Sequence, residues 1–181
     1  MSRTEILIGG VGGQGVVLSG ILLGTAATLF GGKKAVQTQS YSSELRGGSA
    51  RAEVIISEEP VSDPQVRRPD ILIALAEEAL FKYLHQMKPN GLLVIDSDLV
   101  KGTKPGQYEI LQIPATSMAE KEMRNIVVAN LIILGALIKK TGLLSVESME
   151  KAIEVSVPKK AIGLNLSAFR KGLGLSVNQK D

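Results

Sequence analysis

The sequence predicts an α/β fold in which an open, mostly parallel sheet is covered by helices on both faces. Short apolar runs of strand length alternate with longer segments whose apolar residues recur every three or four positions. A glycine-rich turn directly follows the first apolar run, and the last third of the chain consists of helical patterns alone. The 181 residues fit one domain, 1–181, because no shift in composition marks a second.

Each expected element has its own signal. Near-continuous apolar or β-branched runs predict strands, and apolar residues at helical spacing predict helices. Glycine, proline and asparagine clusters separate them, as at 31–32, 60–69 and 89–91. The expected strands cover 6–8, 35–39, 51–57, 70–75, 92–96 and 108–113, and the expected helices cover 14–29, 77–87, 115–123, 126–140, 145–155 and 164–171.

Composition indicates an ordinary globular protein with an aliphatic core. Apolar residues make up 44% of the chain and charged residues 22%, whereas aromatics are only 3%. The net charge of +3 is dispersed along the chain, which disfavours nucleic-acid binding. The start of the chain does not resemble a secretory signal, and the longest apolar helix, 126–138, is too short to cross a bilayer. We therefore expect a cytoplasmic protein without a membrane segment.

The absence of cysteine removes several kinds of chemistry together. Without thiolates the chain cannot provide cysteine ligands for iron–sulfur clusters, thiolate zinc sites, disulfides or a thiol nucleophile. The single histidine, His85, lies in a segment that is typical of a solvated helix end. The Asp96-Ser97-Asp98 segment is better explained as a solvated strand end and helix cap than as a metal site, since a third ligand signal is missing. We predict no metal and no catalytic residue on this chain.

The turn after the first strand matches the pattern G-x-G-x-x-G at Gly10, Gly12 and Gly15. In Rossmann-like folds such a turn directs backbone N–H groups and a helix N-terminus at a phosphate. A tight turn that only packs a small-residue helix on the sheet explains the pattern equally well. The candidates for contact with a cofactor or partner here are Gly10, Gly12, Gly13, Gln14 and Gly15.

Two absences limit what this turn can bind. A dinucleotide site requires an acid about 20 residues further on, at the end of the second strand, but that strand ends in Gln39 and Ser40. A nucleoside-triphosphate loop requires Lys after its last glycine, and Val16 stands there. A free-standing Rossmann-type nucleotide-binding oxidoreductase remains the alternative function, and a small regulatory or scaffold module is a third.

A second group of candidates lies in the loop after the second strand. Glu44, Arg46, Gly47 and Gly48 place an acid and an arginine beside two glycines. The glycines permit unusual backbone angles, and the Arg46 guanidinium suits a carboxylate or phosphate. Taken alone, an internal pairing of Glu44 with Arg46 that shapes a surface turn explains this loop better.

Both motifs together resemble the gamma subunit of 2-oxoacid:ferredoxin oxidoreductases of the 2-oxoglutarate or pyruvate type. The Gly-Gly-Gln-Gly run and the Glu-x-Arg-Gly-Gly loop at this separation form the specific signal, and the resemblance covers nearly the whole chain. The residues that carry it are Ile8–Val17, Ser40-Tyr41, Ser43–Gly48, Arg51–Val54, Ile56-Ser57, Pro69-Asp70, Asn130, Asn165-Leu166, Ala168-Phe169 and Gly172.

The resemblance implies a subunit of a thiamine-diphosphate enzyme that converts a 2-oxoacid and coenzyme A to acyl-coenzyme A and carbon dioxide and reduces ferredoxin. The thiamine signature of that family, Gly-Asp-Gly with a later Asn-Asn, is missing. We therefore expect a non-catalytic gamma subunit that helps assembly and completes the active or coenzyme A site. Thiamine diphosphate and the clusters are expected on the alpha, beta and delta-type partners, with coenzyme A as a shared ligand. Self-association of the isolated subunit stays open.

Overall fold

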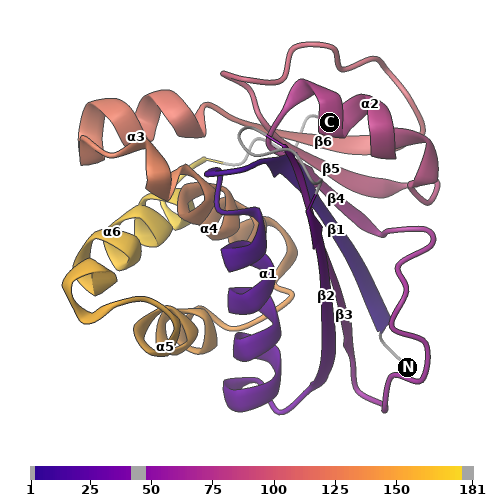
Figure 1. Ribbon diagram of the computed structural model, residues 1–181, viewed down its shortest axis with the longest axis horizontal. Coiled ribbons are helices and arrows are strands. Elements are labelled where there is room, and N and C mark those ends of the chain that lie inside the picture. Colours follow the sequence, from indigo (N-terminus) through magenta and orange to yellow (C-terminus); the bar gives the residue numbers. More distant parts are fainter. Residues whose placement is uncertain (1–2, 42–47, 177–181) are drawn as a thin grey trace.

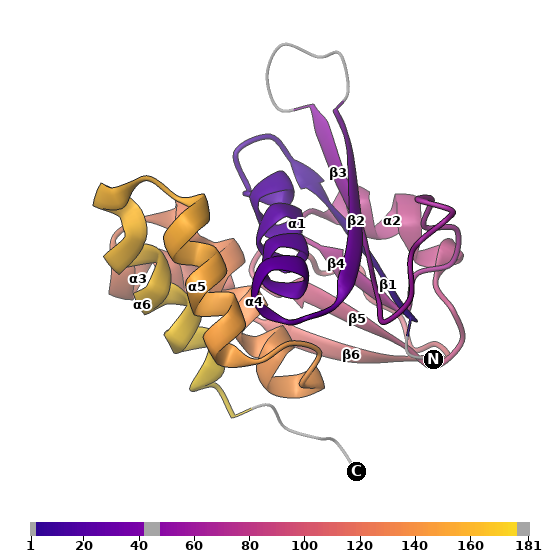
Figure 2. The same cartoon turned by 90° about the horizontal axis from the view of Figure 1, so that it is seen from below.

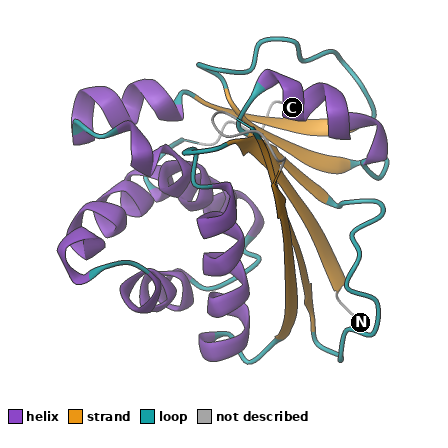
Figure 3. Ribbon diagram, viewed as in Figure 1, coloured by secondary structure: helices purple, strands orange, loops and turns teal. Residues whose placement is uncertain are grey.

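The computed structural model describes residues 3–41 and 48–176, and it shows a six-stranded sheet between two unequal layers of helices (Figure 1). The strands lie in the order β2-β3-β1-β4-β5-β6, and Figure 3 separates them by colour from the helices. The elements in chain order are β1 (Arg3–Val11), α1 (Val16–Thr25), the π-helical turn η1 (Ala26–Phe30), β2 (Lys34–Tyr41), β3 (Ser49–Ser57), β4 (Ile71–Ala74), α2 (Glu77–Tyr83), the 3₁₀ turn η2 (Leu84–Gln86), β5 (Gly91–Asp96), β6 (Tyr108–Ile113), α3 (Ala115–Met123), the 3₁₀ turn η3 (Ile126–Val128), α4 (Ala129–Thr141), α5 (Val146–Ser156), the 3₁₀ turn η4 (Lys159–Ala161) and α6 (Ile162–Leu173).

The sheet is mixed, with one strand reversed. Strands β1, β4, β5 and β6 run parallel to one another, with Ile6 of β1 opposite Ile71 of β4. Strand β3 runs antiparallel to both β1 and β2, and it places Ala50 opposite Gly10 and Tyr41. The predicted α/β fold with an open, mostly parallel sheet is confirmed. The sequence pattern did not indicate that the third strand is inserted, reversed, between the first two.

Alternating side chains of the central strands point into two separate hydrophobic cores. On β1, Ile6 and Ile8 point into the larger core, whereas Leu7 points into the smaller one. Helices α1, α3, α4, α5 and α6 cover the larger core, in which Phe169 is the largest fully buried side chain (Figure 1). Helix α2 covers the smaller core with Leu80 and Tyr83. The helical C-terminal third is therefore what makes the two layers unequal.

Two glycines allow helices α4 and α6 to pack with their backbones in contact. A Cβ on Gly135 would lie 2.1 Å from the carbonyl oxygen of Phe169, and one on Gly172 would lie 2.0 Å from that of Ile132. No side chain can occupy such a position without separating the helices. Gly172, one of the residues that carries the family resemblance, is thus explained by packing.

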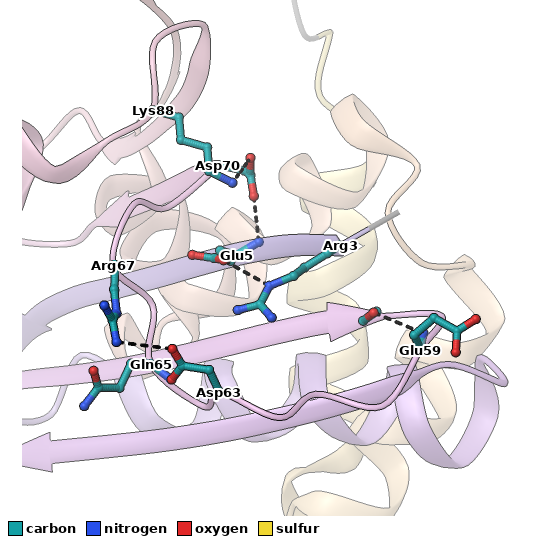
Figure 4. A network of polar contacts seen from close by, with 9 residues as sticks. Arg3, Glu5, Glu59, Asp63, Gln65, Arg67, Asp70 and Lys88 are labelled. Carbon is teal, nitrogen blue, oxygen red and sulfur yellow. Dashed lines mark hydrogen bonds and ion pairs between the residues drawn. The ribbon is translucent and has the colours of Figure 1, made fainter. Parts of the chain in front are cut away.

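Asp70, which directly precedes β4, links this strand to the neighbouring β1 near the start of both strands (Figure 4). Its carboxylate accepts a hydrogen bond from the backbone N–H of Glu5 at 2.8 Å and pairs with Lys88 Nζ at 2.8 Å. Its own N–H donates to the carbonyl of Glu5 at 2.8 Å. Asp70, also part of the resemblance, therefore holds β1 and β4 in register.

Two helices differ from their expected bounds. The segment expected as helix 77–87 ends its α-helix at Tyr83 and continues as η2, where His85 is exposed, as predicted for a solvated helix end. The segment expected as helix 126–140 begins with η3, because the Asn125 side chain accepts from Val127 N–H at 3.1 Å and starts a tight turn. Among the described residues, no helix is both long and apolar enough to cross a bilayer.

Candidate functional site

The glycine motif forms a strand-to-helix turn at the carboxyl edge of the sheet. Strand β1 ends at Val11, and α1 begins at Val16. Gly13 and Gly15 have positive φ angles of 90° and 71°, which other residues adopt only at a cost. The predicted turn between strand and helix is present.

Gln14 links this turn by hydrogen bonds to the end of the adjacent strand β4. Its Oε1 accepts a hydrogen bond from Val11 N–H at 2.8 Å, and its Nε2 donates to the carbonyl of Leu75 at 2.8 Å. Leu75 directly follows β4, the parallel neighbour of β1. Both ends of the Gln14 amide are therefore used within the chain, and only part of this half-buried side chain faces outward.

Asn130 of α4 binds the end of the turn where α1 begins. Its Nδ2 donates to the carbonyl of Gly15 at 3.2 Å and to Ser19 Oγ at 3.1 Å. Its Oδ1 is buried and has no hydrogen-bond partner among the described residues. The sequence pointed to Asn130 through the resemblance alone, and the structure shows that it joins α4 to the N-terminus of α1.

Internal packing explains two of the three motif glycines and leaves the third unexplained. A Cβ on Gly10 would lie 2.5 Å from Gln14 Oε1, and one on Gly15 would lie 2.5 Å from Asn130 Nδ2. A Cβ on Gly12 would meet only the carbonyl oxygen of Gly48, at 3.9 Å. Gly12 is exposed and its φ is not among the positive ones, so the fold itself does not require glycine there.

The second motif reaches the glycine turn through Gly48. The N–H of Gly12 donates to the carbonyl of Gly48 at 3.0 Å, and Gly48 directly precedes β3. The other predicted residues of that loop, Glu44, Arg46 and Gly47, lie outside the described residues. The structure thus brings Gly48 to the same edge of the sheet as Gly10, Gly12, Gly13, Gln14 and Gly15.

A groove of about 440 Å³ opens beside the glycine turn. The N-terminal end of α1 forms one side, and the C-terminal third of the chain forms the other. Its described lining has no carboxylate, imidazole, amine or guanidinium group, and most of it is aliphatic. The lining residues are Val11, Gly12, Gly13, Gly15, Val16, Val17, Leu18, Tyr41, Ala50, Asn125, Val127, Val128, Val157, Pro158, Ala161, Leu164 and Asn165.

The groove can accept a ligand or an apolar segment, but its described lining offers no carboxylate, imidazole or amine for proton transfer. Helix α1 begins without a side-chain cap and without an acidic residue in its first turn, so its N-terminal N–H groups favour a negative charge. Sequence reasoning missed the wall formed by 125–128 and 157–165. In the structure, the first of these segments leaves two large apolar side chains exposed, Ile126 at 59% and Val127 at 61%.

The Asp96-Ser97-Asp98 segment caps a helix, as predicted. Asp96 Oδ2 accepts from Thr116 N–H at 3.1 Å and from Thr116 Oγ1 at 2.6 Å. Asp98 Oδ2 accepts from the N–H and the hydroxyl of Ser117, both at 2.7 Å. Contrary to the expected solvated strand end, Asp96 is buried. In the described parts of the chain, no three His, Asp or Glu side chains form a cluster that could hold a metal ion.

Burial and hydrogen bonding shift the two carboxyl groups in opposite directions. Burial raises the pKa of Asp96, and the hydrogen bond from Thr116 only partly offsets this. Burial also acts to raise the pKa of Asp98, but the two hydrogen bonds from Ser117, helped by Lys101 and Lys121, outweigh it and hold that pKa below its usual value. Both residues are used in fixing the start of α3.

The sheet order separates the glycine turn from the place where a dinucleotide site would need its acid. Strand β3 lies between β1 and β2, so the end of β2 is one strand further away than in a fold whose first two strands are neighbours. Gln39 and Ser40 instead line a separate polar pocket of about 360 Å³ with Arg51, Glu53 and Arg67. This geometry disfavours the nucleotide-binding alternative.

Comparisons with known proteins agree on one family. The protein-family model described as pyruvate ferredoxin/flavodoxin oxidoreductase matches residues 5–175 of this chain. The 2-oxoglutarate synthase subunit KorC of Methanocaldococcus jannaschii is 47% identical over 172 residues, which are 94% of this chain and 92% of the relative.

Two solved structures carry the same fold. The gamma subunit of a keto/oxoacid ferredoxin oxidoreductase from Geobacter sulfurreducens matches with a TM-score of 0.82 and 40% identity, over 93% of this chain and 95% of that chain. The 2-oxoglutarate:ferredoxin oxidoreductase of Magnetococcus marinus, solved with 2-oxoglutarate, coenzyme A and succinyl-CoA, matches with a TM-score of 0.86 and 25% identity. That match covers 99% of this chain but only 32% of the other. The chain therefore belongs to the pyruvate ferredoxin/flavodoxin oxidoreductase family and is a gamma subunit of a 2-oxoacid:ferredoxin oxidoreductase complex.

Proposed function

We propose that this subunit works in a complex that oxidises 2-oxoglutarate and that the glycine turn and its groove complete the coenzyme A site there. The reaction would convert 2-oxoglutarate, coenzyme A and oxidised ferredoxin to succinyl-CoA, carbon dioxide and reduced ferredoxin. The choice of 2-oxoacid rests on the similarity to the KorC subunit, whose name specifies 2-oxoglutarate synthase.

The observation that carries the proposal is Gly12. Gly10 and Gly15 are required by internal contacts, whereas nothing within the described chain requires glycine at position 12. A residue without a side chain on an exposed turn, beside an uncapped helix N-terminus, lets a phosphate approach the backbone closely. The aliphatic groove next to it suits the uncharged arm of coenzyme A.

The role is supportive, and the chemistry belongs to the partners. Thiamine diphosphate supplies the carbanion chemistry of the reaction when it is bound, and we assign it to the alpha and beta partners because its signature is missing here. Iron–sulfur clusters are assigned to a delta-type partner, since a chain without cysteine lacks their usual ligands. The uncharged groove fits a subunit that binds and positions without transferring protons.

Arg46 has a proposed role of its own. Gly48 lies against Gly12, and Arg46 precedes Gly48 by two residues. We assign the Arg46 guanidinium to a phosphate of coenzyme A or to a carboxylate of a partner subunit, with Glu44 orienting it. An Arg46→Ala complex that assembles and forms acyl-coenzyme A at the wild-type rate would contradict this role.

A pair of matched substitutions tests the turn. In both Gly12→Ala and Gly24→Ala, the added methyl group would have its nearest neighbour at 3.9 Å, but Gly24 lies in α1, away from the turn. We expect both isolated chains to fold, while only Gly12→Ala raises the KM for coenzyme A or weakens assembly of the reconstituted complex. If Gly12→Ala matches Gly24→Ala in unfolding, assembly and KM, the turn is not a contact surface.

A further inference from the structure

Strand β2 forms one edge of the sheet, and its outer side has no strand partner among the described residues. It pairs with β3 without interruption from Lys34 opposite Ser57 to Tyr41 opposite Ala50, so no bulge bends it away. None of its eight residues is fully buried, and its last three are exposed. The strand therefore offers a straight row of backbone donors and acceptors.

This edge lacks the features with which proteins usually prevent sheets from pairing edge to edge. Such features are proline, charged residues within the strand, bulges and short length. β2 contains no proline, and its one charged residue, Lys34, stands at its first position. The opposite edge strand, β6, is shorter, and it carries Glu109, which pairs with Lys140. Of the two edges among the described strands, the β2 edge is therefore the less protected.

Exposed apolar side chains occur on the elements that contact or adjoin the same strand. Helix α1 lies next to β2 in Figure 2, and it continues into η1, which leads into β2. Ile21 of α1 is 39% exposed and Leu29 of η1 is 68% exposed. Tyr41, at the end of β2, is 63% exposed. The edge thus combines free backbone groups with apolar surface, as interfaces do.

We propose that β2 pairs antiparallel with β2 of a second copy of this chain, which joins the two sheets into one. A two-fold axis perpendicular to the sheet leaves each side chain on its own face. Residues that lie directly opposite each other must then belong to the same face, so the axis passes through a residue and not between two. That residue is Gln37 or Thr38. Lys34 then faces Ser40 of the other copy directly or diagonally, and two lysines never meet. A strand with a single terminal charge is therefore compatible with itself.

Side chains on both faces of this strand suit such pairing. Gln37 and Gln39 lie on the α1 face, with 3.4 Å between Gln37 Nε2 and Gln39 Oε1, so their amides can continue hydrogen bonding across the axis. On the opposite face, Val36 and Thr38 are β-branched residues that pack well in cross-strand pairs. The two α1 helices then lie on the same face of the joined sheet, and the exposed Ile21 and Leu29 of each copy come to lie beside the new junction.

Charge substitutions at Ser40 test the pairing in the full-length chain. Ser40 is exposed, but within the monomer it lies opposite Arg51 of β3, so Ser40→Lys also adds a like charge beside Arg51 and the stability of each variant is measured along with its association. Gln112→Lys is the matched control, because it adds the same charge at an exposed position of β6. We expect Ser40→Lys to weaken self-association at least about tenfold through repulsion from Lys34, whereas Ser40→Glu and Gln112→Lys retain it.

Sedimentation velocity over a concentration series measures the self-association, and hydrogen exchange of residues 34–41 shows whether β2 is the part protected. Thermal unfolding of each variant confirms that it folds. A wild-type chain that stays monomeric, or equal effects of Ser40→Lys and Gln112→Lys, would overturn the proposal. So would protection of β2 that arises only in the assembled complex, since a partner subunit would then occupy the edge.

Discussion

Asn130 occupies the space that a side chain on Gly15 would need. Its Nδ2 would lie 2.5 Å from a Cβ on Gly15, and the same nitrogen donates to the Gly15 carbonyl at 3.2 Å. Residues 115 positions apart therefore fix the start of α1 together.

Gly15→Ala should destabilise the protein by about 2 to 4 kcal/mol, because it adds backbone strain at a positive φ to a clash with Asn130. Gly32→Ala is the control, since Gly32 has a φ of 64° but open space around it, and it should cost only about 1 kcal/mol. Urea unfolding measures both. The free energy of unfolding of the double variant Gly15→Ala, Asn130→Ala should fall by less than the sum of the losses in the two single variants. Strictly additive losses would show that the clash is absent.

Gly172→Ala should destabilise the protein by about 3 kcal/mol or more, because its methyl group cannot fit against the Ile132 carbonyl without separating α4 from α6. Gly163→Ala lies in the same helix and has open space around it, so it should be neutral or stabilising by up to about 1 kcal/mol. Calorimetry of the two variants gives the comparison. Equal melting temperatures would argue against close backbone packing of the two helices.

Thr116→Val should raise the pKa of Asp96 further, because the carboxylate loses the hydroxyl that donates to it at 2.6 Å. An acid whose folded-state pKa is raised penalises folding in full above that pKa, and the penalty fades as the pH falls toward the unfolded-state value. Thr116→Val should therefore cost about 1 to 3 kcal/mol at neutral pH and less in acid.

Unfolding in urea at several pH values checks this dependence, and NMR titration of the Asp96 carboxyl follows its pKa. Thr116→Ser keeps the hydroxyl and serves as the control. A loss of stability that is the same at every pH would show that the threonine acts through packing alone.

Gln14→Ala should cost about 1 to 3 kcal/mol, because Val11 N–H and the Leu75 carbonyl both lose their partner. Gln14→Glu retains an acceptor for Val11 but turns a carboxylate oxygen toward the Leu75 carbonyl. The variant should therefore be less stable than the wild type at neutral pH and regain stability in acid. Urea unfolding at both pH values is the measurement. Variants that fold normally but bind coenzyme A poorly would instead place Gln14 in direct contact with the ligand.

The sequence predicted the parts of this fold that depend on local pattern. The strand-to-helix turn, the buried strands and the helical last third follow from apolar spacing and glycine positions. The reversed β3 could not be predicted, because its partial alternation fits either direction and only its pairing with β1 and β2 decides.

The candidate site was predictable to a similar extent. The glycines between 10 and 15 were found from spacing. Gly10 is explained by its nearby contact with Gln14, whereas the reason for Gly15 is the contact with Asn130, far along the chain. The far wall of the groove, 157–165, had no local sequence signal that tied it to the turn. Side chains that meet only in the folded state leave little trace in single-sequence periodicity.

The insertion of β3 also has a consequence for how the chain folds. Strand β1 is synthesised first, but both of its neighbours come later, since β3 begins at Ser49 and β4 at Ile71. Strands β2 and β3 are consecutive and antiparallel, so their pairing closes the shorter loop and should form earlier. Strand β1 therefore stays without a sheet neighbour until β3 has emerged from the ribosome, and its apolar residues Ile6, Leu7 and Ile8 are open to non-native contacts until then.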